Sequence, residues 1–204
     1  MIIGGFMAII VDKVQKRKDI ALTCKALFVQ KGIKNLTISR IAKEAGVGKG
    51  TLYDYFQNKE DIVFEIVNIL LSEHDALKEI KIAKATSTKE KIKIFFEFFY
   101  NDEVELRELY KEFVSITLSE PNSEMSEFHA KYYQTYADWF KKVLQEGVAK
   151  GEIIEQAIAL SNGLFALGKG MFLSSCATNC TDTLQHEIES YIDTLFDLIE
   201  VKNG

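Results

Sequence analysis

Apolar residues recur at steps of three and four along most of this chain, which is the spacing of one face of an α-helix. The first such stripe runs from about Lys13 to Lys31 and stops at Gly32, a residue type that commonly ends helices. The pattern predicts further helices over residues 38–45, 48–56, 59–78, 153–176 and 182–201. It also predicts a helix in the phenylalanine-rich segment around 91–100, and two helices that end near residues 118 and 150 and are separated by Pro121. The sequence therefore predicts an all-α fold of about nine helices.

Capping residues mark the starts of the second, third and fourth predicted helices. Thr37, Gly48 and Asn58 precede these helices, and each is of a type that serves as an N-cap. Gly46 ends the second helix and is free to take a positive φ. Two helices of about two turns joined by so short a turn form a helix-turn-helix, in which the N-terminus of the second helix enters the DNA major groove.

The start of the third predicted helix carries side chains suited to reading DNA. Thr51 can bond a base edge or touch a thymine methyl group, and Lys49 can reach guanine or phosphate. Gly50 has no side chain to hold the backbone away from the bases. The hydroxyl groups of Tyr53 and Tyr55 can bond phosphates, although core packing of one of these tyrosines is the alternative.

Charge divides the chain at about residue 60. Residues 13–60 hold 11 Lys and Arg against 4 Asp and Glu, whereas residues 61–204 hold 14 against 25, within a total formal charge of −5. This split indicates a small basic domain that binds a polyanion, joined to a body that does not, and a solvated basic face without a partner is the alternative. We therefore predict a DNA-binding domain over residues 13–60 and a second helical domain over residues 61–204.

The segment IALTCKALFVQKGIKNLTISRIAKEAGVGKGTLYDYFQNKEDI resembles the TetR family of bacterial transcriptional regulators. The resemblance implies an N-terminal three-helix DNA-binding domain and a larger C-terminal helical domain that binds a ligand and dimerises. Gly48 departs from the family pattern by replacing a serine often found there. Asp54 departs by being acidic in a helix that approaches phosphates, so it either points off the DNA backbone or accepts from a cytosine amine. The DNA contacts that the resemblance implies are Thr37, Ser39, Lys49, Gly50, Thr51, Tyr53, Tyr55 and Lys59.

The C-terminal part of the chain is rich in aromatic residues at helical spacing. Core packing explains any one of them, but tyrosines and a histidine on an apolar wall also suit a small-molecule site, because they combine broad apolar contact with a few polar groups. Lys169 is a candidate counter-ion for an anionic ligand, and a lysine that reaches solvent or pairs with an acid fits the sequence equally well. The candidate ligand-binding residues are Phe96, Phe99, His129, Tyr132, Tyr136, Asn162, Phe165 and Lys169.

Small residues in the penultimate helix and an apolar stripe on the last helix suggest a dimer interface. Small side chains let a neighbouring helix approach closely, so these two helices could form a four-helix bundle with the same helices of a second copy. Packing within one chain is the alternative. The candidate interface residues are Gly163, Ala166, Gly170, Ile188, Ile192, Leu195 and Ile199.

Little else in the sequence indicates chemistry. Cys176, Cys180 and His186 are too loosely spaced to favour a metal or redox site, and no phosphate-binding glycine loop, nucleophile elbow or His-Glu metal motif is present. We therefore expect no enzymatic activity, metal or other cofactor. The apolar run of residues 1–11 precedes its basic residues and is too short to span a bilayer, which predicts a cytoplasmic protein without a membrane partner.

These features together predict a homodimeric transcriptional repressor. Its partners are a palindromic double-stranded DNA operator and a small apolar or amphipathic effector that releases the protein from DNA. The alternative is a constitutive DNA-architectural protein without an effector, in which the C-terminal helices serve only to dimerise. A helical small-molecule carrier or an enzyme is the third hypothesis.

Overall fold

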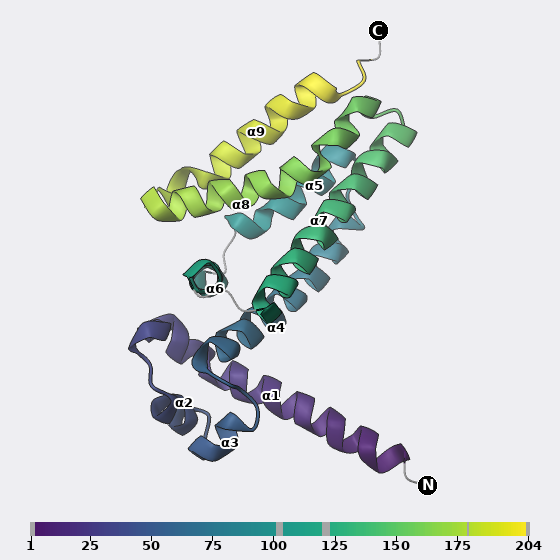
Figure 1. The fold of residues 1–204 in the computed structure, drawn as a ribbon. Helices are drawn as coiled ribbons and strands as arrows, with labels where there is room; N and C mark the ends of the chain where they lie inside the picture. Colours follow the sequence, from purple (N-terminus) through teal and green to yellow (C-terminus); the bar gives the residue numbers. More distant parts are fainter. Residues whose placement is uncertain (1–2, 101–103, 120–122, 179, 203–204) are drawn as a thin grey trace. The chain divides into compact units, whose positions relative to one another are not determined.

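The computed structural model describes residues 3–100, 104–119, 123–178 and 180–202, and these ranges hold helices and one isolated β-bridge between Ile153 and Glu200. The α-helices are α1 (Ile3–Lys31), α2 (Ile38–Glu44), α3 (Lys49–Tyr53), α4 (Lys59–Ile82), α5 (Thr88–Phe96), α6 (Val104–Ser119), α7 (Ser123–Ala149), α8 (Ser161–Thr178) and α9 (Leu184–Ile199) (Figure 1). Short 3-10 helices are η1 (Ile33–Asn35), η2 (Glu97–Phe99), η3 (Glu155–Leu160) and η4 (Thr181–Thr183). The predicted all-α fold is confirmed, while Pro121 lies outside the described residues.

The helices form two compact units. The first unit consists of Met1–Glu73 and Glu103–Pro121, and the second unit consists of His74–Asp102 and Asn122–Gly204. The proposed domain boundary near residue 60 coincides with the start of α4, whereas the two units divide α4 itself and place α6 in the first unit. One continuous helix therefore contributes residues to both units.

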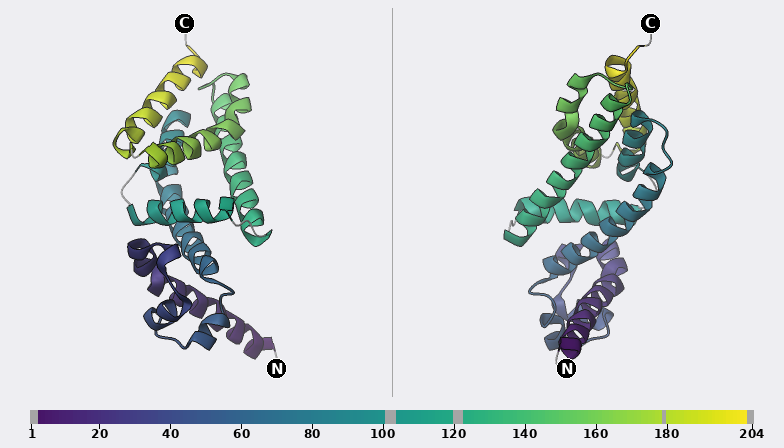
Figure 2. Two further views of the ribbon diagram at one scale, coloured as in Figure 1. Left: turned by 60° about the vertical axis from the view of Figure 1, so that its left-hand side comes forward. Right: turned by 90° about the vertical axis from the view of Figure 1, so that its right-hand side faces the viewer.

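The first unit has its core between α1, α2, α3 and the first half of α4. Ile20, Cys24 and Phe28 form the buried stripe of α1, and Ile41 of α2 and Leu52 of α3 are buried with them. In this unit α2 lies against both α1 and α3, and α6 contacts α1 (Figure 2). The two short helices are therefore held by an apolar core to which α1 contributes most of one stripe.

The second unit packs α8 against α7, and α5 contacts both α7 and α9. Phenylalanine side chains fill the space between these helices: the ring centroids of Phe95 and Phe140 are 4.5 Å apart, and those of Phe99 and Phe172 are 6.0 Å apart. Rings at these separations gain roughly 0.5–1.5 kcal/mol per pair beyond the burial of their surface. The phenylalanine-rich segment predicted to be surrounded by other helices is therefore α5 and η2 at the centre of this unit.

Gly168 allows α8 to lie close to that segment. A Cβ atom at residue 168 would lie 2.3 Å from Cε1 of Phe96 and 2.7 Å from Cε2 of Phe99. The two rings therefore occupy the space that any side chain at residue 168 would need. This contact explains a glycine in the middle of a helix, where glycine costs about 1 kcal/mol relative to alanine.

Residues Glu155–Thr178 form a run that is long and apolar enough to cross a membrane by length and composition alone. One such run is weak support for a membrane span, because core helices of soluble proteins meet the same criterion. In this structure the run is divided between η3 and α8, and it packs against α7 and α9.

Gly168→Ala should destabilise the protein by about 1–3 kcal/mol, because the added methyl group overpacks the contact with Phe96 and Phe99. Gly50→Ala is the control, since a Cβ atom at residue 50 has no neighbour within 4 Å. Urea denaturation of both variants checks the prediction. Equal stability of the two variants would show that α8 can move away from η2 at no cost.

Candidate nucleic-acid interface and ligand site

The turn between α2 and α3 has the geometry that its sequence predicts. Gly46 has a φ of 65°. The N–H of Val47 donates to the carbonyl of Ala42 at 3.0 Å, and the N–H of Gly46 donates to the carbonyl of Lys43 at 3.2 Å. This pair of bonds is a Schellman motif, whose left-handed residue is usually glycine because other residues pay a steric cost there. The motif fixes the direction in which the chain leaves α2 and enters α3.

The predicted caps lie at the starts of the helices they were expected to stabilise. The Thr37 hydroxyl accepts from the N–H of Arg40 at 3.4 Å, and Gly48 is the N-cap of α3. Oδ1 of Asn58 accepts from the N–H of Asp61 at 2.8 Å. These caps give every helix of the helix-turn-helix and the start of α4 a defined first residue.

One side of α3 is buried and the other faces solvent. Leu52 is 1% exposed and Tyr53 is 52% exposed. Lys49, Gly50 and Thr51 are exposed, as are Thr37 and Ser39 at the start of α2. All eight proposed DNA contacts are therefore exposed or half-buried, and seven of them lie in or directly beside the adjacent helices α2 and α3; these are Thr37, Ser39, Lys49, Gly50, Thr51, Tyr53 and Tyr55.

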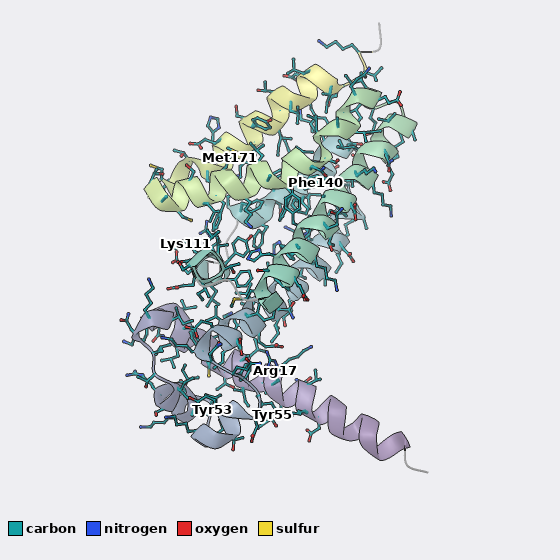
Figure 3. All side chains as sticks on the ribbon, in the orientation of Figure 1. Arg17, Tyr53, Tyr55, Lys111, Phe140 and Met171 are labelled. Carbon is teal, nitrogen blue, oxygen red and sulfur yellow. The ribbon has the colours of Figure 1, made fainter. Side chains whose placement is uncertain are left out.

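Arg17 of α1 holds the end of α3 in place, a role that was not predictable from the sequence. Its Nε donates to the Glu65 carboxylate at 2.8 Å, and a terminal nitrogen donates to the backbone carbonyl of Tyr55. Its guanidinium carbon also lies 4.4 Å from the ring centroid of Phe56. Figure 3 shows Arg17 and Tyr55 next to each other. A single side chain thus joins α1, α4 and the end of α3.

Asp54 and Tyr55 lie beside basic residues of α1. They line a surface hollow of about 380 Å³ together with Lys13, Val14 and Arg17. The Lys13 ammonium is 5.9 Å from the ring centroid of Tyr55. These neighbours offset the negative charge of Asp54, which sits at the end of α3 opposite to its exposed N-terminus.

Lys59, the eighth proposed DNA contact, has a structural role in this unit. Its ammonium donates to the backbone carbonyl of Ile33 at 2.8 Å and to that of Leu36 at 3.4 Å. The Ile33 carbonyl also accepts from the N–H of Leu36 at 3.2 Å, so the Lys59 ammonium adds a second bond to it and ties the start of α4 to both ends of η1. Two of its three N–H groups are occupied in this way, so the proposed phosphate contact would depend on the third.

The second unit buries half of the proposed ligand-binding residues among aromatic rings. Phe96 is 0% exposed and Phe99 is 1% exposed, so neither borders a space that holds water. Tyr136 and Phe165 are also buried, with ring centroids 5.0 Å apart. For Phe96 and Phe99 the packing against Gly168 leaves no free surface, and core packing is the role that this structure gives them.

The other proposed ligand-binding residues lie closer to the surface. His129 and Lys169 are half-buried and near one another, and Tyr132 stacks on Phe128 with a centroid separation of 5.7 Å. Burial, together with the Lys169 ammonium, lowers the pKa of His129 to about 4, and burial lowers the pKa of Lys169. Asn162 contributes its backbone carbonyl, which accepts from the Tyr133 hydroxyl at 3.0 Å.

A polar network that sequence reasoning missed joins α4 to α7 inside this unit. The Lys78 ammonium donates to Oδ1 of Asp75 at 2.6 Å. The Tyr136 hydroxyl donates to the same carboxylate, with 2.7 Å and 2.5 Å to its two oxygens, and lies 2.8 Å from the Tyr132 hydroxyl. In the sequence, Asp75 and Lys78 read as an ordinary exposed pair three residues apart, because nothing local shows that α7 covers them.

The proposed dimer residues of α9 fall on two different faces. Ile188, Ile192 and Ile199 are buried within the chain itself, at 1%, 1% and 7% exposure, because α9 packs this stripe onto α5 and α8. They are therefore unsuitable for contact with a second copy, which corrects the expectation for these three residues. Leu195 is half-buried, and Gly163, Ala166 and Gly170 of α8 remain exposed.

Within the described residues no group of three or more His, Cys, Asp or Glu side chains could hold a metal ion. Burial, with a contribution from the Glu44 carboxylate, raises the pKa of the Cys24 thiol to about 11, so this cysteine is a core residue and not a nucleophile.

Known proteins similar to this chain are regulators. Residues 23–66 match the family model for bacterial regulatory proteins, tetR family. An HTH-type transcriptional regulator of Staphylococcus aureus (strain bovine RF122 / ET3-1) is 24% identical over 133 residues, which make up 63% of this chain and 67% of that protein. Another from Staphylococcus aureus (strain USA300) is 38% identical over 56 residues, which span 28% of this chain and only 30% of that protein's length.

Solved structures of regulators share the fold. A transcriptional regulator from Saccharomonospora viridis in complex with choline matches with a TM-score of 0.76 at 20% identity, covering 93% of this chain and 100% of that one. The regulator FadR from Bacillus subtilis in complex with stearoyl-CoA matches with a TM-score of 0.65 at 23% identity, covering 85% of this chain and 96% of that one. At these identities the likeness establishes the fold alone.

Arg17→Ala should destabilise the first unit by about 2 kcal/mol, because charge-assisted hydrogen bonds are worth roughly 1.5–3 kcal/mol each and partial repair by water is expected. Arg17→Lys should recover little, since an ammonium cannot bond both partners in the planar geometry of a guanidinium. Lys18→Ala removes the same charge from an exposed position and is the control. Thermal denaturation followed by circular dichroism measures the melting temperatures of the variants. Equal melting temperatures for Arg17→Ala and Lys18→Ala would contradict this role of Arg17.

Proposed function

Since the chain belongs to the TetR family of bacterial regulatory proteins and is a transcriptional regulator, we propose that it acts as a homodimeric repressor. In this proposal the dimer binds a near-palindromic operator, and a small apolar or amphipathic molecule bound in the second unit releases it. The observation that carries the proposal is the exposed start of α3, a helix whose opposite side is fixed in the core.

The exposed residues of α3 divide into two kinds of DNA contact. We assign Thr51 to a base edge in the major groove, because it lies in the first turn of the helix that enters the groove. Lys49 and the hydroxyl of Tyr53 are assigned to bases or phosphates nearby, and Gly50 permits close approach. All eight proposed contact residues are exposed or half-buried in the free chain, so their contacts require no unfolding of the core.

An exposed face of α8 and α9 supports the dimer. Only 33% of the most apolar part of Glu155–Thr178 is buried in the chain, and Leu198 of α9 is 75% exposed. A hollow of about 610 Å³ runs along this face, lined by residues that include Ala166 and Gly170 of α8 and Glu187 of α9. An apolar helix with a small-residue face suits a second copy of itself, so we place the interface on Gly163, Ala166, Gly170, Tyr191, Leu195 and Leu198.

The effector is supported by the aromatic group of the second unit. Tyr132, Tyr136 and Phe165 combine apolar rings with hydroxyl groups, as small-molecule sites usually do. Regulators of the same fold have been solved with stearoyl-CoA and with choline, which shows that the fold accommodates small molecules. If no compound changes operator affinity, the constitutive DNA-architectural protein is the better description.

Thr51→Ala should weaken binding only where the preferred base is present, by about 1–3 kcal/mol, because the lost contact is specific to one base pair. Titration of wild type and variant against operator and scrambled duplexes at several salt concentrations measures this. The slope of log affinity against log salt should stay nearly constant, since no phosphate contact is lost. Equal weakening on both duplexes would assign Thr51 to the DNA backbone instead.

Leu198→Asp should convert the dimer into monomers, because it places a charge in the apolar face proposed as the interface. Sedimentation velocity measures the outcome. Leu77→Asp is the matched control, since Leu77 of α4 is 60% exposed and lies outside the proposed interface. A Leu198→Asp protein that sediments as a dimer would place the interface elsewhere.

A further inference from the structure

An ammonium group is buried in an aromatic box within the second unit. The Lys78 side chain is 8% exposed. Its nitrogen lies 4.3 Å from the ring centroid of Phe95 and 4.6 Å from that of Tyr136. The ring of Phe95 is stacked in turn on Trp139, with centroids 4.9 Å apart. Lys78 of α4 therefore inserts its charge between rings that come from α5 and α7.

The groups around this ammonium are those that recognise organic cations in general. Aromatic faces attract a cation through their quadrupoles, and a carboxylate adds a charge-assisted hydrogen bond. Both are present, because Asp75 accepts from Lys78 at 2.6 Å and is held in turn by the Tyr136 hydroxyl. The structure thus already contains an ammonium ion in a complete cation site, and the ion is part of the chain.

The carboxylate of this site is open to solvent while the ammonium is not. The Asp75 side chain is 35% exposed, against 8% for Lys78. A soluble cation would therefore meet Asp75 first and could exchange with Lys78 at the carboxylate. Burial lowers the pKa of Lys78 against the opposing effect of Asp75, so the ammonium is held at a desolvation cost that its release to water would relieve.

We propose that Asp75, Phe95 and Tyr136 form the charge-recognition subsite of the effector site, that its ligand is an organic ammonium compound, and that Lys78 fills the subsite as a tethered competitor. This proposal rests on the ligand-responsive regulator proposed above. The apolar body of the ligand lies against Tyr132 and Phe165, the rings adjacent to Tyr136.

A cation fits the geometry better than an anion. The half-buried neighbours His129 and Lys169 offer an anion a single charge, because burial and the Lys169 ammonium lower the pKa of His129 to about 4 and keep its imidazole neutral at pH 7. The Asp75 subsite has two ring faces, a carboxylate and a hydroxyl at contact distance. Anionic probes are therefore the informative negative control.

Chemical rescue tests the subsite directly. Lys78→Ala removes four side-chain atoms, which correspond to n-propylammonium, and leaves the Asp75 charge without its cation. The variant should melt at a lower temperature, and millimolar n-propylammonium should raise that temperature while propionate and 1-propanol do not. The Lys78→Ala, Asp75→Asn double variant should show no rescue. Equal effects of the three probes on Lys78→Ala would overturn the proposal.

The unmodified protein offers a second measurement, which does not require the Lys78→Ala variant to fold. Trp139 is the single tryptophan of the chain and stacks on Phe95, so its fluorescence reports on the box. Benzyltrimethylammonium should change this fluorescence saturably, whereas benzoate and benzyl alcohol should not. Asp75→Asn should weaken the binding at least tenfold, and Asp138→Asn, an exposed carboxylate beside Trp139 in the chain, should not. Binding of benzoate in place of the cation would move the charge recognition to Lys169 and refute the subsite.

Removal of the competitor should also strengthen ligand binding. If Lys78 fills the subsite most of the time, a ligand binds only to the fraction that is vacant, and Lys78→Ala should bind benzyltrimethylammonium at least tenfold more tightly than wild type. All these readouts are made without DNA. If the protein binds the cation but its operator affinity does not change, the subsite proposal stands and the proposed effector response is wrong. The two proposals can therefore fail separately.

Discussion

A helix of five residues cannot maintain its own shape in water, because isolated helices shorter than about 12–15 residues are marginal even in favourable sequences. The helix proposed to read DNA, α3, is of this length, so its shape and direction are supplied from outside it. The Schellman turn at Gly46 sets where it starts, the buried side chain of Leu52 fixes its inner face, and Arg17 holds the carbonyl of Tyr55 at its end. The contacts on the buried side of α3 hold its backbone in one position. The exposed side chains that are proposed to read DNA therefore also have one defined position.

The second unit meets a different constraint, since it must place polar groups among phenylalanines. A buried ion pair is often no more stable than apolar residues of the same volume, whereas loss of one partner is costly. Asp75 and Lys78 are therefore poor choices for stability alone. The desolvation cost of the two charges is offset by the hydrogen bond from the Tyr136 hydroxyl and by two aromatic ring faces. These contacts fix the position of the carboxylate as well as that of the ammonium. Such a site has the chemistry of ligand recognition even while the chain itself occupies it.

Local signals in the sequence predicted the order of the helices and the turn at Gly46, because caps and glycine conformations depend on residues a few positions apart. Two predicted helix starts were wrong: α1 begins at Ile3 and not near Lys13, and α8 begins at Ser161, after η3, and not near Ile153. Contacts over long separations were not predictable in the same way. The roles of Arg17, Lys59 and Lys78 each depend on a partner from another helix, and an isolated basic residue in a helical pattern gives no sign of one. The last helix shows a further limit of sequence-based prediction. Ile188 and Leu198 are both apolar, and only the packing of α9 on α5 and α8 shows that the chain buries Ile188 and leaves Leu198 exposed.

The exchange of one ammonium for another also determines where the binding energy of an effector would come from. An incoming cation replaces the bond between Lys78 and Asp75 with a similar bond, so the charged subsite contributes selectivity and little net affinity. The apolar body must then supply most of the free energy, at roughly 25 cal/mol for each Å² of surface removed from water. A hundredfold loss of operator affinity needs about 2.7 kcal/mol of differential binding between two conformations, which corresponds to roughly 110 Å² of such surface.

Because Asp75 and Lys78 belong to α4, and α4 also contributes its first half to the unit that contains α3, release of Lys78 would act on a helix that both units share.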